Sequence, residues 1–546
     1  MRNNSQMKTN ILTYILILFA VLQLQAQKKS AKLSTSKPNI LFIMSDDHTT
    51  QAFGVYGSRL ATLNPTPNID KLANEGIIFD NVYCNNSICT PSRASILTGQ
   101  YPQTNGVLDL HQPLDVAKQY LPKEMQALGY ETAVIGKWHL KNEPGNFNYY
   151  EVLPLQGKYH NPTLISKNGK KTEKINFGKG NIRTVKTTKY TGHSSDIITD
   201  RSIEWLKNKR DKSKPFMLMH HFKAPHGMFE FADRYKDYLE DTYIPEPASL
   251  YQRGNNGSIA TRGKDDSLIH DIGSSVGLRN TIRGVGRSLD IDTNIPDHKH
   301  KSYQEYLKRY LRCVKGVDDN VKRLIDELKA EGLYDNTIII YTADQGFMLG
   351  EHDYIDKRWM YEESMRMPFI VHFPKGLEQG IRKDALINNT DFAPTLIDIA
   401  GGKAPSYMQG HSFKDLLNGA KETKKWQKST YYRYWMHMGS RHANPAHFGI
   451  RTKDYKLIFF YGKFWKPKDQ IKQDGWGRYD FDTPAGWEFY DLKKDPEEMQ
   501  NEYHNPKYAK IVKNMKKDLK KKRKNLNEED ANFPHIQTVI KNHWND

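Results

Sequence analysis

The chain has 546 residues, a formal net charge of +18 and three cysteines, and 38% of its residues are hydrophobic. This length allows either two or three typical domains or one large α/β core with an appendage. Three cysteines exclude a disulfide framework, so packing has to hold the fold together. The excess of basic over acidic residues indicates a polyanion as partner, because excess positive charge raises the local concentration of anionic ligands.

The N-terminal residues 1–26 have the pattern of a cleavable secretory signal. Arg2 and Lys8 precede an apolar run from Ile11 to Leu22, and Gln25-Ala26-Gln27 follows it. An anchoring helix is the alternative, but the run is shorter than the roughly 20 residues that a membrane span needs. We therefore expect an exported mature chain without a stable membrane span, periplasmic or secreted. An exported chain without a nucleic-acid-binding motif favours anionic carbohydrate as partner, and no nucleic acid.

Four short apolar runs predict buried β-strands. They are Ile40–Met44, Thr132–Ile135, Phe216–Phe222 and Ile338–Tyr341. Amphipathic helical patterns lie between them, the longest over Tyr303–Gly332. Buried strands that alternate with helices predict an α/β fold with a large, mostly parallel sheet sandwiched by helices.

Polar and charged side chains stand directly after each of these strands. They are Asp46, Asp47 and His48 after the first, Lys137 and His139 after the second, Lys223 and His226 after the third, and Asp344 and Gln345 after the fourth. Ligands of open α/β sheets bind outside the carboxyl ends of the strands, so we expect these side chains at one edge. A single Asp-Asp pair is more often a turn or a helix N-cap, but four such endings favour a site. Carboxylates and an amide oxygen are hard ligands suited to Ca²⁺ or Mg²⁺.

The segment Cys89-Thr90-Pro91-Ser92-Arg93, followed by Leu97-Thr98-Gly99, resembles the signature of the type I sulfatases of the alkaline phosphatase-like superfamily. Companion segments stand in that family's order at Asp46-Asp47, Gly136-Lys137-Trp138-His139, Pro225-His226, Asp344-Gln345-Gly346, Gly350-Glu351-His352 and Asp356-Lys357-Arg358. The resemblance extends from Lys37 to Tyr503, and the family members that the chain resembles are bacterial polysaccharide sulfatases. In that family the signature cysteine is oxidised to Cα-formylglycine. The resemblance therefore implies a formylglycine-generating or equivalent maturation enzyme as a partner.

The resemblance also implies a metal site. Asp46, Asp47, Asp344 and Gln345 would hold one Ca²⁺, with an oxygen of the formylglycine made from Cys89 completing the set. Gln345 departs from the pattern, because many relatives have Asn or His there. The hydrated aldehyde would act as the nucleophile: one hydroxyl attacks sulfur, and the other then expels sulfate as the aldehyde forms again.

The remaining catalytic roles are likewise carried over from the resemblance. Arg93 would hydrogen-bond the formylglycine, and Lys137 and Lys357 would bind sulfate oxygens. His226 would protonate the leaving alcohol oxygen as general acid. His139 would stabilise the hydrate or act as a base during sulfate expulsion.

Beyond about Ser429, aromatic and polar residues alternate and predict a small antiparallel sheet. We therefore divide the chain into a signal peptide (1–26), a catalytic domain (37–428) and a C-terminal α+β subdomain (429–546). In the family this subdomain lies beside the active-site cleft, and we expect His352 and His447 to contact the substrate. Further candidates for sugar contacts are Trp435, His437, His442 and Arg451. A structural sheet with scattered histidines is an equal alternative.

Three features stay open from the sequence. The basic stretch Tyr508–Leu526 fits an amphipathic docking helix with a solvated face, or a surface that attracts a sulfated polymer. The polar segment Arg253–Asp297 is either a lid or disordered. Cys84 and Cys313 have no pattern that shows whether they pair.

Together these features predict an exported sulfatase, a sulfuric ester hydrolase that acts on a sulfated polysaccharide or its oligosaccharides, for example algal ulvan or carrageenan. One alternative is a phosphate or phosphonate ester hydrolase of the same superfamily. The other is a catalytically silent sugar-binding protein in which Cys89 stays unmodified.

Overall fold

The computed structural model describes residues 37–546 except 179, 277–290, 292–294, 378, 440–441 and 472–476. The predicted signal peptide 1–26 lies outside the described residues, and so does part of the polar segment 253–297. Among the helices that the structure describes, none is both long enough and apolar enough to cross a membrane.

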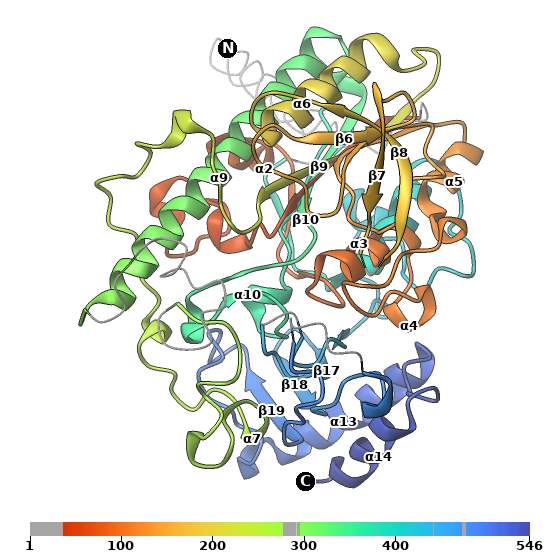
Figure 1. The fold of residues 1–546 in the computed structure, drawn as a ribbon. Helices are drawn as coiled ribbons and strands as arrows, with labels where there is room; N and C mark the ends of the chain where they lie inside the picture. The colour runs from red at the N-terminus through yellow and green to blue at the C-terminus, as the bar shows by residue number, and fades with distance from the viewer. Residues whose placement is uncertain are drawn as a thin grey trace, which may run out of the picture.

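Eleven strands of the described part form one sheet at the centre of the molecule (Figure 1). In the order in which they lie side by side, they are β14 (Ile381–Lys383), β2 (Ile77–Phe79), β13 (Phe369–His372), β10 (Thr337–Ala343), β1 (Asn39–Asp46), β9 (Phe216–Pro225), β4 (Glu131–Lys137), β5 (Tyr149–Leu153), β6 (Thr163–Ser166), β8 (Ile182–Lys189) and β7 (Lys171–Asn176). The five strands from β10 to β5 pair in parallel. The pairs outside them are antiparallel, apart from β14 with β2, so the sheet is mixed with a parallel centre.

The four strands predicted from apolar runs are β1, β4, β9 and β10, and they lie next to one another at this parallel centre. Both faces of each are covered, which explains why their sequences are continuous apolar runs rather than alternating ones. In β1, Ile40 and Phe42 pack into the core on one face, and Leu41 and Ile43 pack into the core on the other. The α/β fold class is confirmed.

Helices cover the two faces of the sheet. The longest, α9 (His298–Ala330), packs on one face with α2 (Pro67–Asn74) and α6 (Ser194–Glu204), and it confirms the helix predicted there. The other face carries α3 (Cys89–Thr98), α5 (Tyr120–Ala127) and α11 (Phe392–Ile399). Cys84 and Cys313 are buried free thiols that belong to the cores on opposite faces, so they do not pair.

A second, four-stranded antiparallel sheet follows, as predicted: β16 (Thr430–Tyr434), β17 (His447–Arg451), β18 (Tyr455–Phe460) and β19 (Gly486–Asp491). It lies below the large sheet in Figure 1. Tyr432, Ile458 and Phe460 on one face join the core that covers one face of the large sheet. The other face packs against α13 (Ala509–Asn525) and α14 (Pro534–His543). The two sheets therefore share one hydrophobic core.

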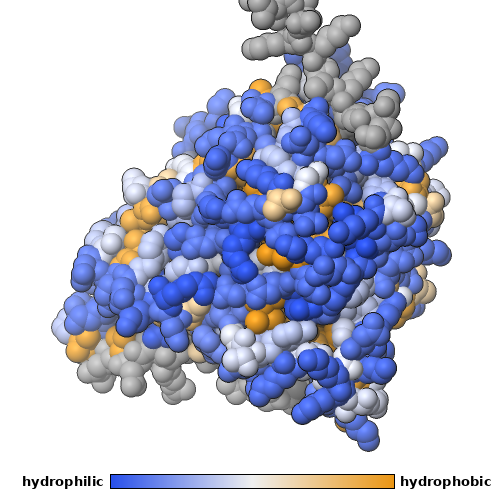
Figure 2. All heavy atoms as spheres, turned by 90° about the horizontal axis from the view of Figure 1, so that it is seen from above, coloured by the Kyte–Doolittle hydropathy of each residue, from blue (hydrophilic) through white to orange (hydrophobic). Residues whose placement is uncertain are grey.

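The outer surface is mostly hydrophilic. Figure 2 shows apolar residues on the upper face only as small, separate spots. Large hydrophobic side chains that are exposed in the described part are Ile182, Met228, Tyr243, Tyr251, Ile259 and Tyr407. Scattered exposed apolar residues of this kind need no partner to explain them.

Candidate active site

The acidic cluster forms where β1 and β10 end side by side. The two strands are parallel and in register, with Ser45 opposite Ala343, so Asp46, Asp47 and Asp344 leave the sheet together. Their carboxylate oxygens come within 4.8 Å of one another, and all three residues are buried. The backbone N–H of Asp47 donates to Asp344 Oδ1 at 3.2 Å.

Cys89 begins α3 and points into this cluster. Its Sγ lies 3.3 Å from Asp46 Oδ1, and donor atoms of Cys89, Asp46 and His226 lie within 4.8 Å of one another. The side chain is 1% exposed, and burial raises the pKa of its thiol to about 11. A thiol held in this state is a poor nucleophile at neutral pH, because the thiolate is the reactive form.

Arg93, one helical turn after Cys89, ties three elements together. Its Nε donates to Asp344 Oδ2 at 2.9 Å, and its Nη1 donates to the carbonyl of Lys137 at 2.7 Å. The close packing beneath this contact needs a glycine at Gly136, which has φ of +108°. A Cβ atom there would lie 1.9 Å from the carbonyl oxygen of His221.

Two buried lysines pair with the acidic residues. Lys137 Nζ pairs with Asp46 and also donates to Gln156 Oε1 at 2.5 Å. Lys357 Nζ pairs with Asp47. Burial and then the nearby cations hold the pKa of Lys137 well below its usual value. Burial also lowers the pKa of Lys357, but the surrounding negative groups, Asp47 first, outweigh it and raise that pKa.

The predicted histidines lie at the same edge. His226 follows β9 and places Nε2 3.8 Å from Asp47 Oδ2, with its side chain 12% exposed. His139 is buried, and its Nδ1 has no hydrogen-bond partner within the described part of the chain. Burial first, and then the charge of Lys137, hold the pKa of both imidazoles well below the usual range. A negatively charged ligand beside His226 would raise this pKa and favour the protonated imidazole.

Lys223 is a member of the cluster for which no specific role was predicted. It lies on β9 and is 5% exposed. Its Nζ stands 4.5 Å from the centre of the Tyr159 ring, and no described carboxylate lies within ion-pair distance. Tyr159 in turn donates to the carbonyl of His226 at 2.5 Å. Burial lowers the pKa of Lys223 to about 8. Only its position after the third predicted strand pointed to this edge, and nothing local in the sequence marks Tyr159 or Gln156.

The residues on both sides of Lys357 are held in strained conformations. Asp356 and Arg358 have φ of +75° and +88°, which is uncommon for residues other than glycine. Arg358 pairs with Asp356, and His442 Nδ1 lies 2.9 Å from Asp356 Oδ2. Strain of this kind persists where the surrounding structure fixes it, often at functional sites.

The other predicted substrate contacts lie inside the packed structure. His352 and His447 are each 0% exposed. The ring of His447 lies 4.7 Å from that of Phe460 and 5.5 Å from that of Tyr432. Trp435 and His437 are also buried, and Arg451 pairs with Glu362. Substrate contact by His352 or His447 stays a prediction. Of the candidates in this region, His442 is more exposed than these two.

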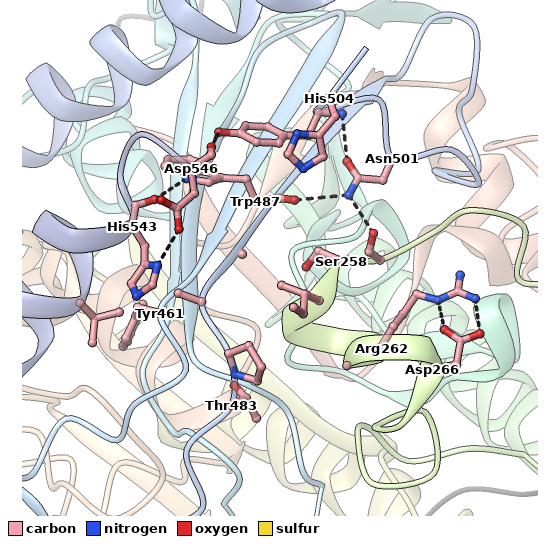
Figure 3. Close-up of a pocket in the computed structure, with 18 of the residues that line it drawn as sticks. Ser258, Arg262, Asp266, Tyr461, Thr483, Trp487, Asn501, His504, His543 and Asp546 are labelled. Carbon is pink, nitrogen blue, oxygen red and sulfur yellow. Dashed lines mark hydrogen bonds and ion pairs between the residues drawn. The ribbon is translucent and has the colours of Figure 1, made fainter.

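A cavity of about 1250 Å³ lies elsewhere, between α7 (Ile259–Arg262) and β19 (Figure 3). Ser258 and Arg262 stand on one side of it, and Trp487 and Asn501 on another. Its lining contains none of the predicted catalytic residues.

The donor set fits one hard divalent cation. Gln345 Nε2 donates to Asp47 Oδ1, whereas Gln345 Oε1 is buried without a hydrogen-bond partner in the described residues. Three converging carboxylates and this free amide oxygen are all-oxygen ligands, the type that Ca²⁺ prefers. The predicted residues Asp46, Asp47, Asp344 and Gln345 are thus suitably placed.

Residues 38–402 match the family described as Sulfatase, and residues 350–525 match N-sulphoglucosamine sulphohydrolase, C-terminal. The chain belongs to the sulfatase family. An N-acetylglucosamine-6-O-sulfatase of Bacteroides thetaiotaomicron is 38% identical over 96% of this chain and 93% of its own length. An ulvan-active sulfatase of Formosa agariphila is 28% identical over 90% of this chain and 81% of its own length.

A solved structure extends the likeness to the fold. It is described as a complex with its substrate D-glucosamine-2-N,6-O-disulfate, and it superposes with a TM-score of 0.76 at 36% identity. The match covers 91% of this sulfatase and 99% of that chain. The resemblance seen in the sequence is confirmed, and the protein is a sulfuric ester hydrolase.

Proposed function

We propose that this sulfatase removes sulfate from a sulfated carbohydrate, with 6-O-sulfated N-acetylglucosamine as the first candidate unit. The relative with 38% identity is named for that activity, and the solved neighbour is described with a 6-O-sulfated glucosamine as substrate. Ulvan is the second candidate, from the relative with 28% identity. One observation carries the proposal: Cys89 lies beside Asp46 and His226, within a cluster that also contains the buried cations Lys137 and Lys357.

We propose that Cys89 works as formylglycine. Burial raises the pKa of the unmodified thiol to about 11, so the thiol would supply little nucleophile at neutral pH. As a hydrated aldehyde, this residue supplies a hydroxyl nucleophile together with a second hydroxyl for release of sulfate. Asp46, Asp47, Asp344 and Gln345 would hold Ca²⁺, which supplies Lewis-acid stabilisation of negative charge when bound.

The protein's own side chains then bind the sulfate and move the proton. Lys137 and Lys357 would hydrogen-bond the sulfate oxygens, and Lys223 would add a third positive charge. His226 would donate a proton from Nε2 to the ester oxygen as the bond between that oxygen and sulfur breaks. Arg93 holds Asp344 and the Lys137 carbonyl in place, so it keeps the strand ends in register.

Export is the remaining part of the proposal. Its support is the basic and then apolar pattern of residues 1–26, which predicts a cleavable signal and a periplasmic or secreted protein. N-terminal sequencing of the protein recovered from its native host after fractionation tests this. A start near Gln27 in the periplasmic or secreted fraction is expected, and an intact Met1 in the cytoplasm would contradict it.

Measurement of sulfate release tests the activity. The panel contains 6-O-sulfated N-acetylglucosamine, its 3-O-sulfated isomer, ulvan oligosaccharides and carrageenan oligosaccharides, each with wild type and Cys89→Ala. We expect release from the 6-O-sulfated sugar that Cys89→Ala abolishes. Equal release from the isomer would contradict the positional proposal, and activity retained by Cys89→Ala would contradict the role of that residue.

The alternatives are separated by two further measurements. Paired 4-nitrophenyl sulfate and 4-nitrophenyl phosphate distinguish a sulfatase from a phosphate ester hydrolase of the same fold, and we expect preference for the sulfate. A protein that binds the sugars but releases no sulfate, with Cys89 unmodified, would be the silent binding protein instead.

A further inference from the structure

The helix α13 concentrates a large share of the chain's positive charge. Its 17 residues contain nine Lys or Arg and one Asp, a net charge of +8 within a chain whose total is +18. Like charges at i,i+3 and i,i+4 positions destabilise a helix. Docking of the helix requires apolar residues on one side, but it does not require this excess of lysine on the other.

Packing accounts for the apolar side of α13 and for three of its cations. Val512, Met515 and Leu519 are buried in the core that this helix shares with the outer face of the C-terminal sheet. Three basic residues have partners within the protein. Lys516 donates to the carbonyl of Trp544, Lys522 to Ser429, and Arg523 to the carbonyl of Glu528.

The other six cations form a row on the surface, here called the lysine row. It consists of Lys510, Lys513, Lys517, Lys520, Lys521 and Lys524, all exposed. None has an ion pair or a hydrogen bond to another described residue. Their spacing of three or four residues aligns them along one side of the helix over about 20 Å. Docking and internal pairing therefore leave the lysine row unexplained.

The position of the lysine row separates it from the catalytic cluster. α13 contacts β17 and β18 on the face of the C-terminal sheet opposite to the one that joins the core of the large sheet. None of the lysines in the row belongs to the cluster around Cys89. A ligand on the row would therefore act by holding a long substrate near the enzyme.

We propose that the lysine row is a docking surface for a sulfated polysaccharide, distinct from the catalytic site. This rests on the proposed function, in which the catalytic site takes sulfate esters of carbohydrate. Six ammonium groups in a row complement the repeated negative charges of a polyanion. The electric field over such a row raises the local concentration of the polyanion. Tethering at a second point then raises the effective concentration of the chain at the catalytic site.

Two other classes of polyanion fit the lysine row less well. Insertion into a membrane surface needs an exposed apolar side, and the apolar side of α13 is buried against the sheet. Single-stranded nucleic acid is held by aromatic stacking beside the charges, and the row contains only lysine.

The test compares two variants of the full protein with equal loss of charge. One replaces Lys513, Lys517, Lys520 and Lys524 in the row with Gln. The control replaces four exposed lysines dispersed over the catalytic domain, Lys71, Lys123, Lys236 and Lys403, with Gln. Binding to dextran sulfate is measured at several salt concentrations, with uncharged dextran as reference. Turnover of 4-nitrophenyl sulfate is measured in parallel.

We expect the row variant to bind dextran sulfate about tenfold or more weakly at 0.15 M salt, with a reduced salt dependence, and the control to change by less than about twofold. Both should turn over 4-nitrophenyl sulfate as wild type does, and thermal unfolding should show both folded. Equal weakening in the two variants would overturn the proposal, because net charge alone would then explain binding. Unchanged binding in both variants would also overturn it, because the lysine row would then not contribute to binding.

Two further comparisons distinguish this proposal from other polyanion partners and from the proposed function. Tighter binding of wild type to phosphatidylserine vesicles or to single-stranded DNA than to dextran sulfate at equal salt would overturn the choice of partner. Binding is read without turnover, so failure of the candidate sugars as substrates would leave a positive binding result intact. Failure of binding would likewise leave sulfate release from small sugars unaffected.

Discussion

Six charged side chains are buried together around Cys89, and their formal charges balance. They are Asp46, Asp47 and Asp344 against Arg93, Lys137 and Lys357, and none is more than 3% exposed. Removal of one partner from a buried pair leaves an unpaired charge and costs about 3–5 kcal/mol of stability. Variants of these six residues test folding and catalysis together. Variants at the edge of the cluster separate the two.

His226 is one such edge residue, and its role can be tested through the leaving group. A general acid contributes about 10²–10⁴-fold where the leaving alcohol needs a proton. We expect His226→Ala to lose activity in this range on a sugar sulfate, and much less on 4-nitrophenyl sulfate, whose phenolate leaves unaided. Lys357→Ala should lower both, because both substrates present the same sulfate. An equal loss on the two substrates in His226→Ala would contradict the general-acid role.

Lys223 allows a sharper separation of activity from stability. Its ammonium is buried without a carboxylate at ion-pair distance among the described residues, so its desolvation is unfavourable for folding. We expect Lys223→Met to lower kcat/KM for sulfate esters by about tenfold to a hundredfold, while the unfolding temperature stays equal or rises. Lys223→Arg, which keeps the charge, should recover part of the activity. Full activity in Lys223→Met with a lower unfolding temperature would show a purely structural role.

At the scale of elements, α9 caps the start of α2 through one carboxylate. Asp318 accepts the backbone N–H groups of Asn68 and Ile69 at 3.0 and 2.9 Å. Asp318→Ala would leave buried N–H groups without an acceptor, at a cost of about 1–3 kcal/mol in the free energy of unfolding. Asp326→Ala on an exposed part of the same helix should cost less than about 0.5 kcal/mol. Denaturant titration at pH 7 measures both, and equal costs would contradict the capping role.

The same contact predicts a pH dependence of known sign. Burial raises the pKa of Asp318 from 3.8 to about 6, although the N–H donors act against this rise. The folded chain therefore binds this proton more tightly than the unfolded chain, and the contribution of Asp318 to stability falls as the pH rises from about 4 to about 6. The stability difference between wild type and Asp318→Ala should shrink over that window. A difference that grows with pH would contradict the predicted shift.

The parallel centre of the sheet could be predicted from the sequence, because strands that are buried on both faces consist of continuous apolar runs, as in Ile338–Tyr341. The antiparallel strands outside that centre were not predicted. Lys171–Asn176 is largely exposed and polar, so nothing in its composition marks a strand. The site followed the same division. The residues at strand ends were predicted, Lys223 among them. The contacts of Lys223 with Tyr159 and of Asp356 with His442 were not, because they form only through long-range packing.

His447 shows a further limit of sequence reasoning. Residues along β17 alternate between the two faces of its sheet, and the chain itself does not mark which face meets the catalytic domain. His447 lies in the aromatic packing with Phe460 and Tyr432, two residues that belong to the shared core. Only the pairing of β16, β17 and β18 reveals that environment.

At the scale of the whole molecule, the proposed Ca²⁺ ligands come from two neighbouring strands, with Cys89 of α3 beside them, so the ion would join central elements. Binding to the folded state alone stabilises a protein by about 2.7 kcal/mol at a ligand concentration of 100 times Kd. Treatment with EGTA should lower both the unfolding temperature and the activity, and added Ca²⁺ should restore both. Asp344→Asn should respond much less to added Ca²⁺. Full activity in protein shown by elemental analysis to lack metal would contradict this site.

The oxidation state of Cys89 is the centre of the proposed mechanism, and mass spectrometry of the peptide that contains it is the most direct test. In an active preparation treated with an alkylating reagent, we expect a residue about 18 Da lighter than cysteine, or its hydrate, with no alkylation at position 89. Cys84 and Cys313, buried free thiols, should alkylate once the protein is unfolded. Complete alkylation of Cys89 in a preparation that hydrolyses sulfate esters at its full rate would contradict the mechanism.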